Sequence, residues 1–457
     1  MSLTFFAGKK NKPDTSGYLF SNNDLKKLII PLILEQVLAI TVGMADSMMV
    51  ASAGESAVSA VSLADSIFIL LINLFAALGT GGAVICGQQI GRKEPEVACR
   101  AANQLLLFTG AFSAAIMALT YMFRPFILHV VFGKITEEVM TNCNTYLLIV
   151  AASIPFIALY NAGAAIFRSM GDSKTAMYMS LVMNGINLVG NAILIFGLHM
   201  GVAGAAIPTL ISRMVAAIVI LRLLMNQNKT VHILLPFSFR FDFSLLKKIL
   251  GIGIPNGLEN SMFQLGKILV LSIVSGFGTA SIAANAVCNN LASFQILPGM
   301  AMGFAMLTVI SQCIGAGDYE QARYYVRKML CIAYACIAAS SALIVLALPF
   351  LIQLYHLSPE AAEYTRNIIY AHTAGSLTIW PLAFTLPNAL RAASDVKRTM
   401  ICSVLSMWIF RIGFSYLFGI YTGLGVFGVW LAMEIDWVFR TICFVYRYRS
   451  NKWLPAH

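Results

Sequence analysis

Residues 88–98 read QQIGRKEPEVA and residues 312–322 read QCIGAGDYEQA, so one pattern returns after 224 positions. A third stretch, RSMGDSK at 168–174, matches RAASDVK at 391–397 after one deletion. The separation of 224 also joins Pro31 with Pro255, Glu35 with Glu259, Gly91 with Gly315, Pro125 with Pro349, and Gly201 with Gly425. These matches predict two homologous halves.

The composition around this repeat is that of an integral membrane protein. Of 457 residues, 59% are hydrophobic and only 11% are charged, and the mean hydropathy is +0.78. This is more apolar surface than one or two soluble domains can bury. Stretches such as 326–352 are apolar on every face, which excludes the alternating strands of a membrane barrel and leaves a helical bundle.

The length permits about twelve membrane-spanning helices, since each needs about 20 apolar residues. Six apolar stretches bounded by charge, Gly or Pro occupy the first half, and six more occupy the second. The expected helices are 26–50, 62–87, 98–122, 144–166, 176–197, 203–223, 247–275, 284–314, 326–350, 364–389, 399–420 and 426–447.

Six helices per half is an even number, so both halves keep one orientation, as in transporters built from parallel repeats. We expect an N-lobe at 25–223, a linker at 224–246 and a C-lobe at 247–447, flanked by tails at 1–24 and 448–457. In such transporters the substrate binds between the lobes near the middle of the bilayer.

The net charge of +11 concerns orientation in the membrane and does not indicate a nucleic-acid partner. Counted by side, 25 Lys and Arg fall in one set of loops and tails, against three on the other, Arg124, Lys134 and Arg366. This asymmetry predicts a multi-pass plasma-membrane protein with both termini in the cytoplasm. The nine Cys and six His form no paired metal-binding pattern, so we expect no metal centre and no cofactor.

Charged side chains inside a spanning helix are costly, at about 2.5 to 3.5 kcal/mol each, and therefore suggest function. Asp46 is the first candidate, as a carboxylate that binds a proton or a cation; the alternative is a helix-terminus cap. Asn184, Asn187 and Asn191 share one helix face and could complete its site, or could instead hold neighbouring helices together.

Other intramembrane polar residues fall into two groups. Arg411, Glu434 and Asp436 lie at matching depths in adjacent helices, so we expect a structural ion pair among them. The candidates for lining a substrate cavity are Glu35, Asn184, Glu259, Lys267, Asn285 and Asn289, although each could instead be structural.

Two stretches resemble the multidrug and toxic compound extrusion (MATE) family, prokaryotic branch. They are PLILEQVLAITVGMADSMMVASAGESAVSAVSLADS, starting at Pro31, and RSMGDSKTAMYMSLVMNGINLVGNAILIFGLHMGVAGAAIPTLISR, starting at Arg168. The resemblance covers residues 25–447. It implies twelve helices in two six-helix lobes, and export of cationic or amphipathic organic compounds in exchange for inward protons or sodium.

Carried over by position, the family's coupling site falls on Asp46, Asn187 and Thr209. Several prokaryotic members have Asp where this chain has Asn191. With one carboxylate fewer, the site is expected to bind a proton rather than to hold sodium tightly. We therefore expect a proton- or sodium-coupled antiporter, monomeric, with small organic cations or drugs and the lipid bilayer as its partners.

Three alternatives differ in sequence signature. A lipid-linked oligosaccharide flippase of the same superfamily would need a wide cationic cavity, for which intramembrane Arg and Lys are few. A membrane-embedded enzyme would need clustered catalytic residues, and the chain has neither H-E-x-x-H nor G-x-S-x-G. A channel would be recognised by single-channel currents.

Overall fold

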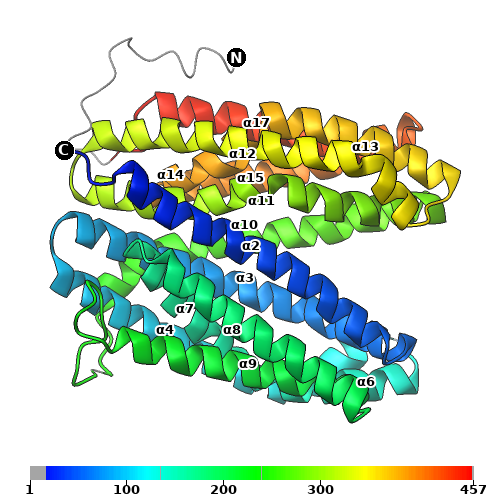
Figure 1. The fold of residues 1–457 in the computed structure, drawn as a ribbon, viewed down its shortest axis with the longest axis horizontal. Coiled ribbons are helices and arrows are strands. Elements are labelled where there is room, and N and C mark those ends of the chain that lie inside the picture. The colour runs from blue at the N-terminus through cyan, green and yellow to red at the C-terminus, as the bar shows by residue number, and fades with distance from the viewer. Residues whose placement is uncertain (1–16, 134, 238, 455–457) are drawn as a thin grey trace. The chain divides into compact units, whose positions relative to one another are not determined.

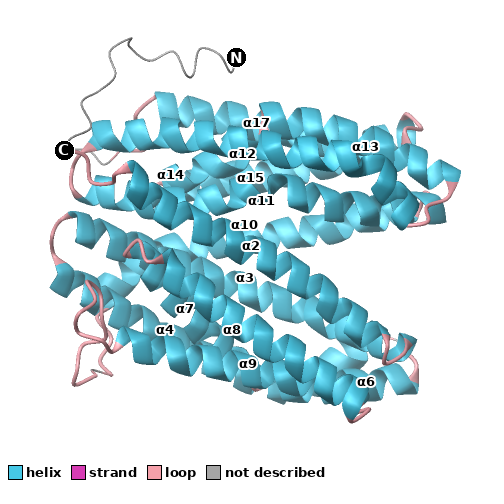
Figure 2. Cartoon of the chain, viewed as in Figure 1, coloured by secondary structure: helices cyan, strands magenta, loops and turns pink. Residues whose placement is uncertain are grey.

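The computed structural model describes residues 17–133, 135–237 and 239–454, and throughout these ranges it contains helices and connecting loops without a strand (Figure 2). Most of the predicted N-terminal tail lies outside the described residues. So do four of the basic residues used to predict the orientation, namely Lys9, Lys10, Lys12 and Lys134.

The first half of the described chain forms six helical segments (Figure 1). Short additional helices end the third and fifth, and the fourth is broken in two. The elements are α2 (Asn22–Ala51), α3 (Glu55–Gly91), α4 (Pro95–Met122) with α5 (Arg124–Phe126) and η1 (Ile127–Val131), α6 (Glu137–Ala151) with α7 (Ile154–Ser169), α8 (Ser173–Asn191) with η2 (Ala192–Gly197), and α9 (Gly201–Leu224).

The second half forms six further segments, of which the fourth and fifth are interrupted by π-helical turns. The elements are α10 (Phe243–Ser275), α11 (Thr279–Gly315), α12 (Tyr319–Leu354), α13 (Pro359–Thr378) with η3 (Pro381–Thr385) and α14 (Leu386–Ala392), α15 (Val396–Leu405) with η4 (Ser406–Ile412), α16 (Gly413–Ser415) and η5 (Tyr416–Tyr421), and α17 (Gly425–Arg449).

Eight of the described helices are long and apolar enough to cross a membrane, and a ninth crossing is added if α6 and α7 count together. The remaining segments, α10, α13 with α14, and α17, carry more polar residues. Glu259 and Lys267 lie within α10, and Glu434, Asp436 and Arg440 lie within α17. These polar groups lower the hydropathy of segments whose place in the repeat corresponds to that of a spanning helix.

The expectation of one continuous helix at 144–166 is wrong. The chain bends by 48° between α6 and α7. Pro155 stands in the first turn of α7, where its missing N–H breaks no hydrogen bond, and it disfavours helical backbone in the preceding residue. The hydroxyl of Ser153, at the break, donates to the carbonyl of Val150.

The chain divides into two compact units that exchange the starts of two helices. Of the described residues, one unit contains those within 30–257, and the other contains 17–29 together with 258–454. The first turns of α2 therefore belong with the C-terminal helices, and the first half of α10 belongs with the N-terminal helices. The lobe boundaries expected from the sequence, 25–223 and 247–447, remain a prediction.

The repeat extends to the backbone conformation of the turns. Gly171 has a φ of 82°, and its counterpart in the second half, Ser394, has a φ of 67°. Lys93 and its counterpart Gly317 have φ values of 61° and 74°. Left-handed backbone is costly for residues other than glycine, so its retention at Ser394 and Lys93 shows that the turn itself is required.

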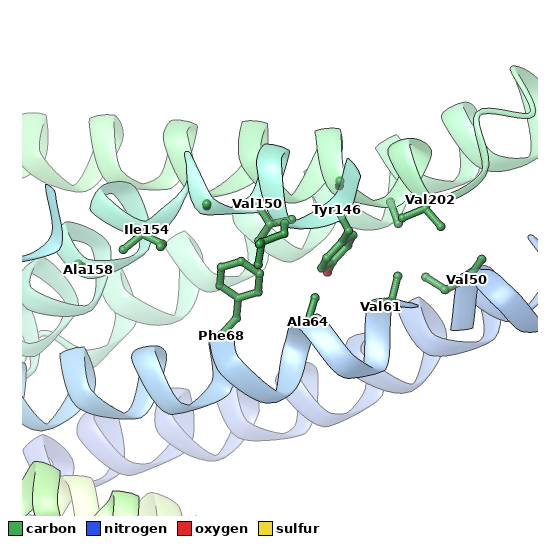
Figure 3. Close-up of a cluster of buried hydrophobic side chains, with 14 of the residues drawn as sticks. Val50, Val61, Ala64, Phe68, Tyr146, Val150, Ile154, Ala158 and Val202 are labelled. Atoms are coloured by element: carbon green, nitrogen blue, oxygen red, sulfur yellow. The ribbon is translucent and has the colours of Figure 1, made fainter. Parts of the chain in front are cut away.

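Within the unit of residues 30–257, α3 packs against α4, α6 and α7, while α9 packs against α6, α7 and α8 (Figure 1). Their core is an apolar cluster (Figure 3). Phe68 and Tyr146 meet there edge to face, with ring centroids 6.4 Å apart. This packing fixes the helices that carry the polar residues described below.

The predicted linker is held against the same unit. Lys229 forms an ion pair of 2.8 Å with Asp172, which also caps the start of α8. The side chain of Gln104 donates to the carbonyl of Arg240 and accepts from the N–H of Asp242, at 2.9 Å in both cases. The described residues of the linker therefore lie against α4 and the turn that precedes α8.

Candidate functional site

The carboxylate of Asp46 meets an asparagine from another helix. The side-chain amide of Asn191, the last residue of α8, donates a hydrogen bond to Oδ1 of Asp46 in α2. Asn191 is completely buried. An isolated charge at such a place would be costly, and an amide donor is one of the few neutral groups that can stabilise it.

The polar contacts continue away from Asp46. Nδ2 of Asn191 also lies 3.4 Å from Oδ1 of Asn187, and Nδ2 of Asn187 donates to the hydroxyl of Thr209 at 3.0 Å. That hydroxyl donates in turn to the carbonyl of Ala205, at 2.9 Å. The four side chains expected from the sequence thus form one connected chain across α2, α8 and α9.

A glycine allows α8 and α9 to approach closely enough for this contact. A Cβ atom built on Gly190 would lie 2.7 Å from Cβ of Pro208, closer than real atoms come. Gly190 precedes Asn191, and Pro208 precedes Thr209. The absent side chain therefore sets the separation at which Asn187 reaches Thr209.

A second polar group lies in the same unit. The hydroxyl of Tyr146 donates to Oδ1 of Asp65 at 3.0 Å, and Nη1 of Arg213 donates to the hydroxyl of Ser153 at 2.8 Å. The guanidinium of Arg213 interacts electrostatically with both Asp46 and Asp65. A fixed positive charge near Asp46 repels any cation that approaches the site.

Glu35 and Glu259 are engaged in ion pairs. The guanidinium of Arg168 binds Glu35, and Nη2 of Arg391 lies 2.7 Å from Oε1 of Glu259. Both carboxylates are buried. The two pairs occupy equivalent places in the repeat. The arginine of RSMGDSK and the arginine of RAASDVK each bind the equivalent glutamate of their own half.

Sequence reasoning missed Arg168 and Arg391 as these partners. The signal was present, because each glutamate and each arginine of these pairs recurs at the equivalent position of both halves.

The Asp46 site does not recur. The positions equivalent to Asp46, Asn187, Asn191 and Thr209 are Val270, Phe410, Phe414 and Met433. The carboxylate site therefore belongs to the first half alone.

The expected ion pair in the second half forms without Glu434. Nη1 of Arg411 lies 3.8 Å from Oδ2 of Asp436, and Nε of Arg440 lies 2.9 Å from Oδ1 of Asp436. Glu434 precedes Asp436 by two residues, which turns it by about 200° around α17. It approaches Gly375 of α13, where a Cβ would lie 3.2 Å from its carboxylate.

The remaining candidates are separate from the Asp46 chain. Asn184 donates to Ser180 at 3.3 Å, and Asn285 accepts from the indole of Trp430 at 3.0 Å. Asn289 donates to the carbonyl of Asn285 at 2.8 Å. The ammonium of Lys267 lies 5.2 Å from the ring centroid of Phe263.

A family model named MatE matches the chain twice, over residues 31–193 and 255–417. The two starts, 31 and 255, are 224 positions apart, which confirms the internal repeat.

Two relatives match over nearly the whole chain. The uncharacterized transporter YisQ of Bacillus subtilis is 28% identical over 449 residues, covering 97% of this chain and 96% of that protein. The probable multidrug resistance protein NorM of Thermotoga maritima is 24% identical over 443 residues, covering 94% of this chain and 92% of that protein.

Solved structures show the same fold. A crystal structure of MATE in complex with MaL6 is similar with a TM-score of 0.87 at 24% identity, covering 94% of this chain and 96% of that one. An outward-facing multidrug resistance MATE family transporter of the MOP superfamily gives 0.86 at 24% identity and the same coverage. The expected fold of twelve helices in two six-helix lobes is confirmed. This chain belongs to the MatE family of multidrug efflux transporters and is not an enzyme.

Proposed function

We propose that this transporter exports cationic or amphipathic organic compounds in exchange for inward protons, and that Asp46 carries the proton. The observation that supports this most is the hydrogen-bonded chain from Asp46 through Asn191 and Asn187 to Thr209. It gives one half-buried carboxylate neutral hydrogen-bond partners within an apolar unit, where protonation removes a partly desolvated charge.

Asn191 suits both protonation states of Asp46. Its amide nitrogen donates to the charged carboxylate, and its oxygen, Oδ1, is buried and has no hydrogen-bond partner among the described residues. Rotation of the amide would turn that oxygen towards a protonated carboxyl group and accept its hydrogen bond. An aspartate at position 191 would lack the donor and would add a second negative charge.

Sodium is the alternative coupling ion, and the hydrogen bonding favours it less. Hard cations bind through several oxygen ligands. Here the oxygen of Asn187 accepts from Asn191, and the hydroxyl of Thr209 accepts from Asn187. The side chain facing Asp46 supplies an N–H group.

Coupling would follow from alternating access. Protonation of Asp46 favours the state that releases the compound outward, and the bound compound favours the charged state. Each ligand can shift this equilibrium only by its difference in affinity for the two states. We further propose that one chain suffices for transport and lies in the plasma membrane with both termini in the cytoplasm.

The coupling ion can be identified in proteoliposomes loaded with a fluorescent cationic dye. We expect an imposed pH gradient to drive dye efflux and an equal sodium gradient at constant pH to have no effect. Efflux that responds to sodium alone would reject Asp46 as a proton carrier. Dye movement with neither gradient, accompanied by single-channel currents, would indicate a channel.

A further inference from the structure

Three cationic side chains surround one aromatic ring in the second half of the chain. The ring belongs to Phe263 in α10. The ammonium of Lys267 lies 5.2 Å from its centroid, the guanidinium of Arg411 in η4 lies 5.4 Å away, and that of Arg440 in α17 lies 5.5 Å away. Such contacts offset part of the cost of placing cations in an apolar environment.

The three cations lie near the carboxylate of Asp436, and Arg440 is the one that forms a close ion pair with it. Asp436 accepts from Nε of Arg440 at 2.9 Å and also from the hydroxyl of Ser406. Arg411 remains at 3.8 Å, near the limit of an ion pair. Glu259 of α10 also interacts electrostatically with Arg440, and its ion-pair partner Arg391 balances its charge. Apart from that pair, the local balance is three positive charges to one negative charge.

The other titratable groups nearby do not correct this balance. Glu434 faces α13 on the other side of α17. His372 of α13, which also interacts electrostatically with Arg411, is hydrogen-bonded to Gln295 at 2.6 Å. Within the described residues, Lys267 forms no ion pair and no hydrogen bond, and its ammonium lies over the ring of Phe263.

The cations adjoin an aromatic surface. Phe410, beside Arg411 in η4, stacks on Phe439 at 4.4 Å and on Phe414 at 5.8 Å between centroids. These three rings and Phe263 are partly accessible, and Lys267 is exposed, whereas Arg440 is buried. An accessible ammonium beside accessible rings can contact a molecule that is both acidic and aromatic.

We propose that Lys267 and Arg411 bind the acidic group of an aromatic, amphipathic small molecule, whose rings lie against Phe263 and Phe410. The site would hold the acidic group of an exported compound, and it rests on the export function proposed above. An anionic group would relieve the repulsion between Lys267 and Arg411, which the protein leaves without a full counter-charge.

The test compares two dyes that differ in one charge. A xanthene dye with a free carboxylate and the methyl ester of the same dye are titrated against the full-length protein in phosphatidylcholine nanodiscs. We expect the acid to bind about tenfold more tightly than the ester. In Lys267→Met the preference falls to within about twofold while ester binding is kept, and in Lys267→Arg the preference persists.

The matched control is Lys174, whose ammonium lies 5.6 Å from the ring centroid of Tyr178 in the other half of the chain. Lys174→Met should keep the full preference for the acid. Equal binding of acid and ester to the wild type, or an unchanged preference in Lys267→Met, would overturn the proposal. Loss of the preference when phosphatidylglycerol is added would assign the site to a lipid headgroup and would also overturn it.

Transport separates this site from the proposed function. The preference for the acid could depend on Lys267 in a protein that transports the ester independently of the pH gradient. That result would support the binding site and reject coupling at Asp46. Proton-driven efflux of the ester without any preference for the acid would reject the site alone.

Discussion

The guanidinium of Arg168 in α7 is ion-paired with the carboxylate of Glu35 in α2, and Arg391 and Glu259 form the same pair in the second half. The two halves share this structural contact but not the Asp46 site. We infer that duplication preserved the packing of each half and that the coupling chemistry is confined to one of them.

Removing one member of the first pair should destabilise the protein strongly. We expect Arg168→Gln or Glu35→Gln to cost about 3–5 kcal/mol, because each breaks a largely buried ion pair. The double variant should be more stable than either single variant. Thermal unfolding in detergent measures this, and additive losses in the double variant would show that the pair has no energetic coupling.

Gly190→Ala should disturb the coupling site through the backbone. Its methyl group would meet Pro208, so α8 and α9 must separate, at a cost of about 1–3 kcal/mol, and the Asn187–Thr209 hydrogen bond should break. We expect slower proton-driven dye efflux. Gly185→Ala, on the same helix with open space around it, is the control. Equal efflux by both variants would contradict this explanation.

Asn191→Asp should change the response to ions. A second carboxylate beside Asp46 supplies the oxygen ligands and the charge that a hard cation prefers. We expect the variant to gain sodium-stimulated dye efflux that the wild type lacks. The measurement is the initial efflux rate at constant pH over a series of sodium concentrations, and a variant as insensitive as the wild type would refute the prediction.

The linker contact should make a pH-dependent contribution to stability. Burial disfavours the charged carboxylate of Asp172, but hydrogen bonds from Lys229 and Thr175 outweigh it, so its pKa lies below 3.8. A lowered pKa stabilises the folded state above about pH 3.9, and this contribution is lost as the pH falls through the folded-state value.

Asp172→Asn should therefore be less stable than the wild type at pH 7. The loss should be about 1 kcal/mol or less, because the ion pair is partly exposed, and it should disappear in strong acid. Melting temperatures of both proteins across an acid pH series test this. A difference that persists unchanged to the lowest pH would show that the charge of Asp172 is not its cause.

Much of this architecture could be predicted because its signals are local or repeated. The repeat of 224 residues revealed two halves, and helical periodicity placed Asn187 and Asn191 on one face. The proximity of Asp46 and Thr209 to that face came from family resemblance. Periodicity identifies the polar face of a helix but does not identify which other helix packs against it.

The unpredicted features depend on contacts between distant helices. The partner of Glu35 lies 133 residues away in the chain, so no local pattern reveals it. Glu434 and Asp436 have similar depths but opposite directions around α17, and depth alone does not distinguish them. The bend between α6 and α7 follows from Pro155, whose effect is hidden by continuous hydropathy.

The most direct test of the account measures dye-induced proton flux in Asp46→Asn. In proteoliposomes under a pH gradient, adding the cationic dye should make the wild type dissipate the gradient as it transports the dye. The variant amide cannot take up a proton, so it should still bind the dye but show neither proton flux nor efflux. Proton flux in Asp46→Asn equal to that of the wild type would contradict the central claim.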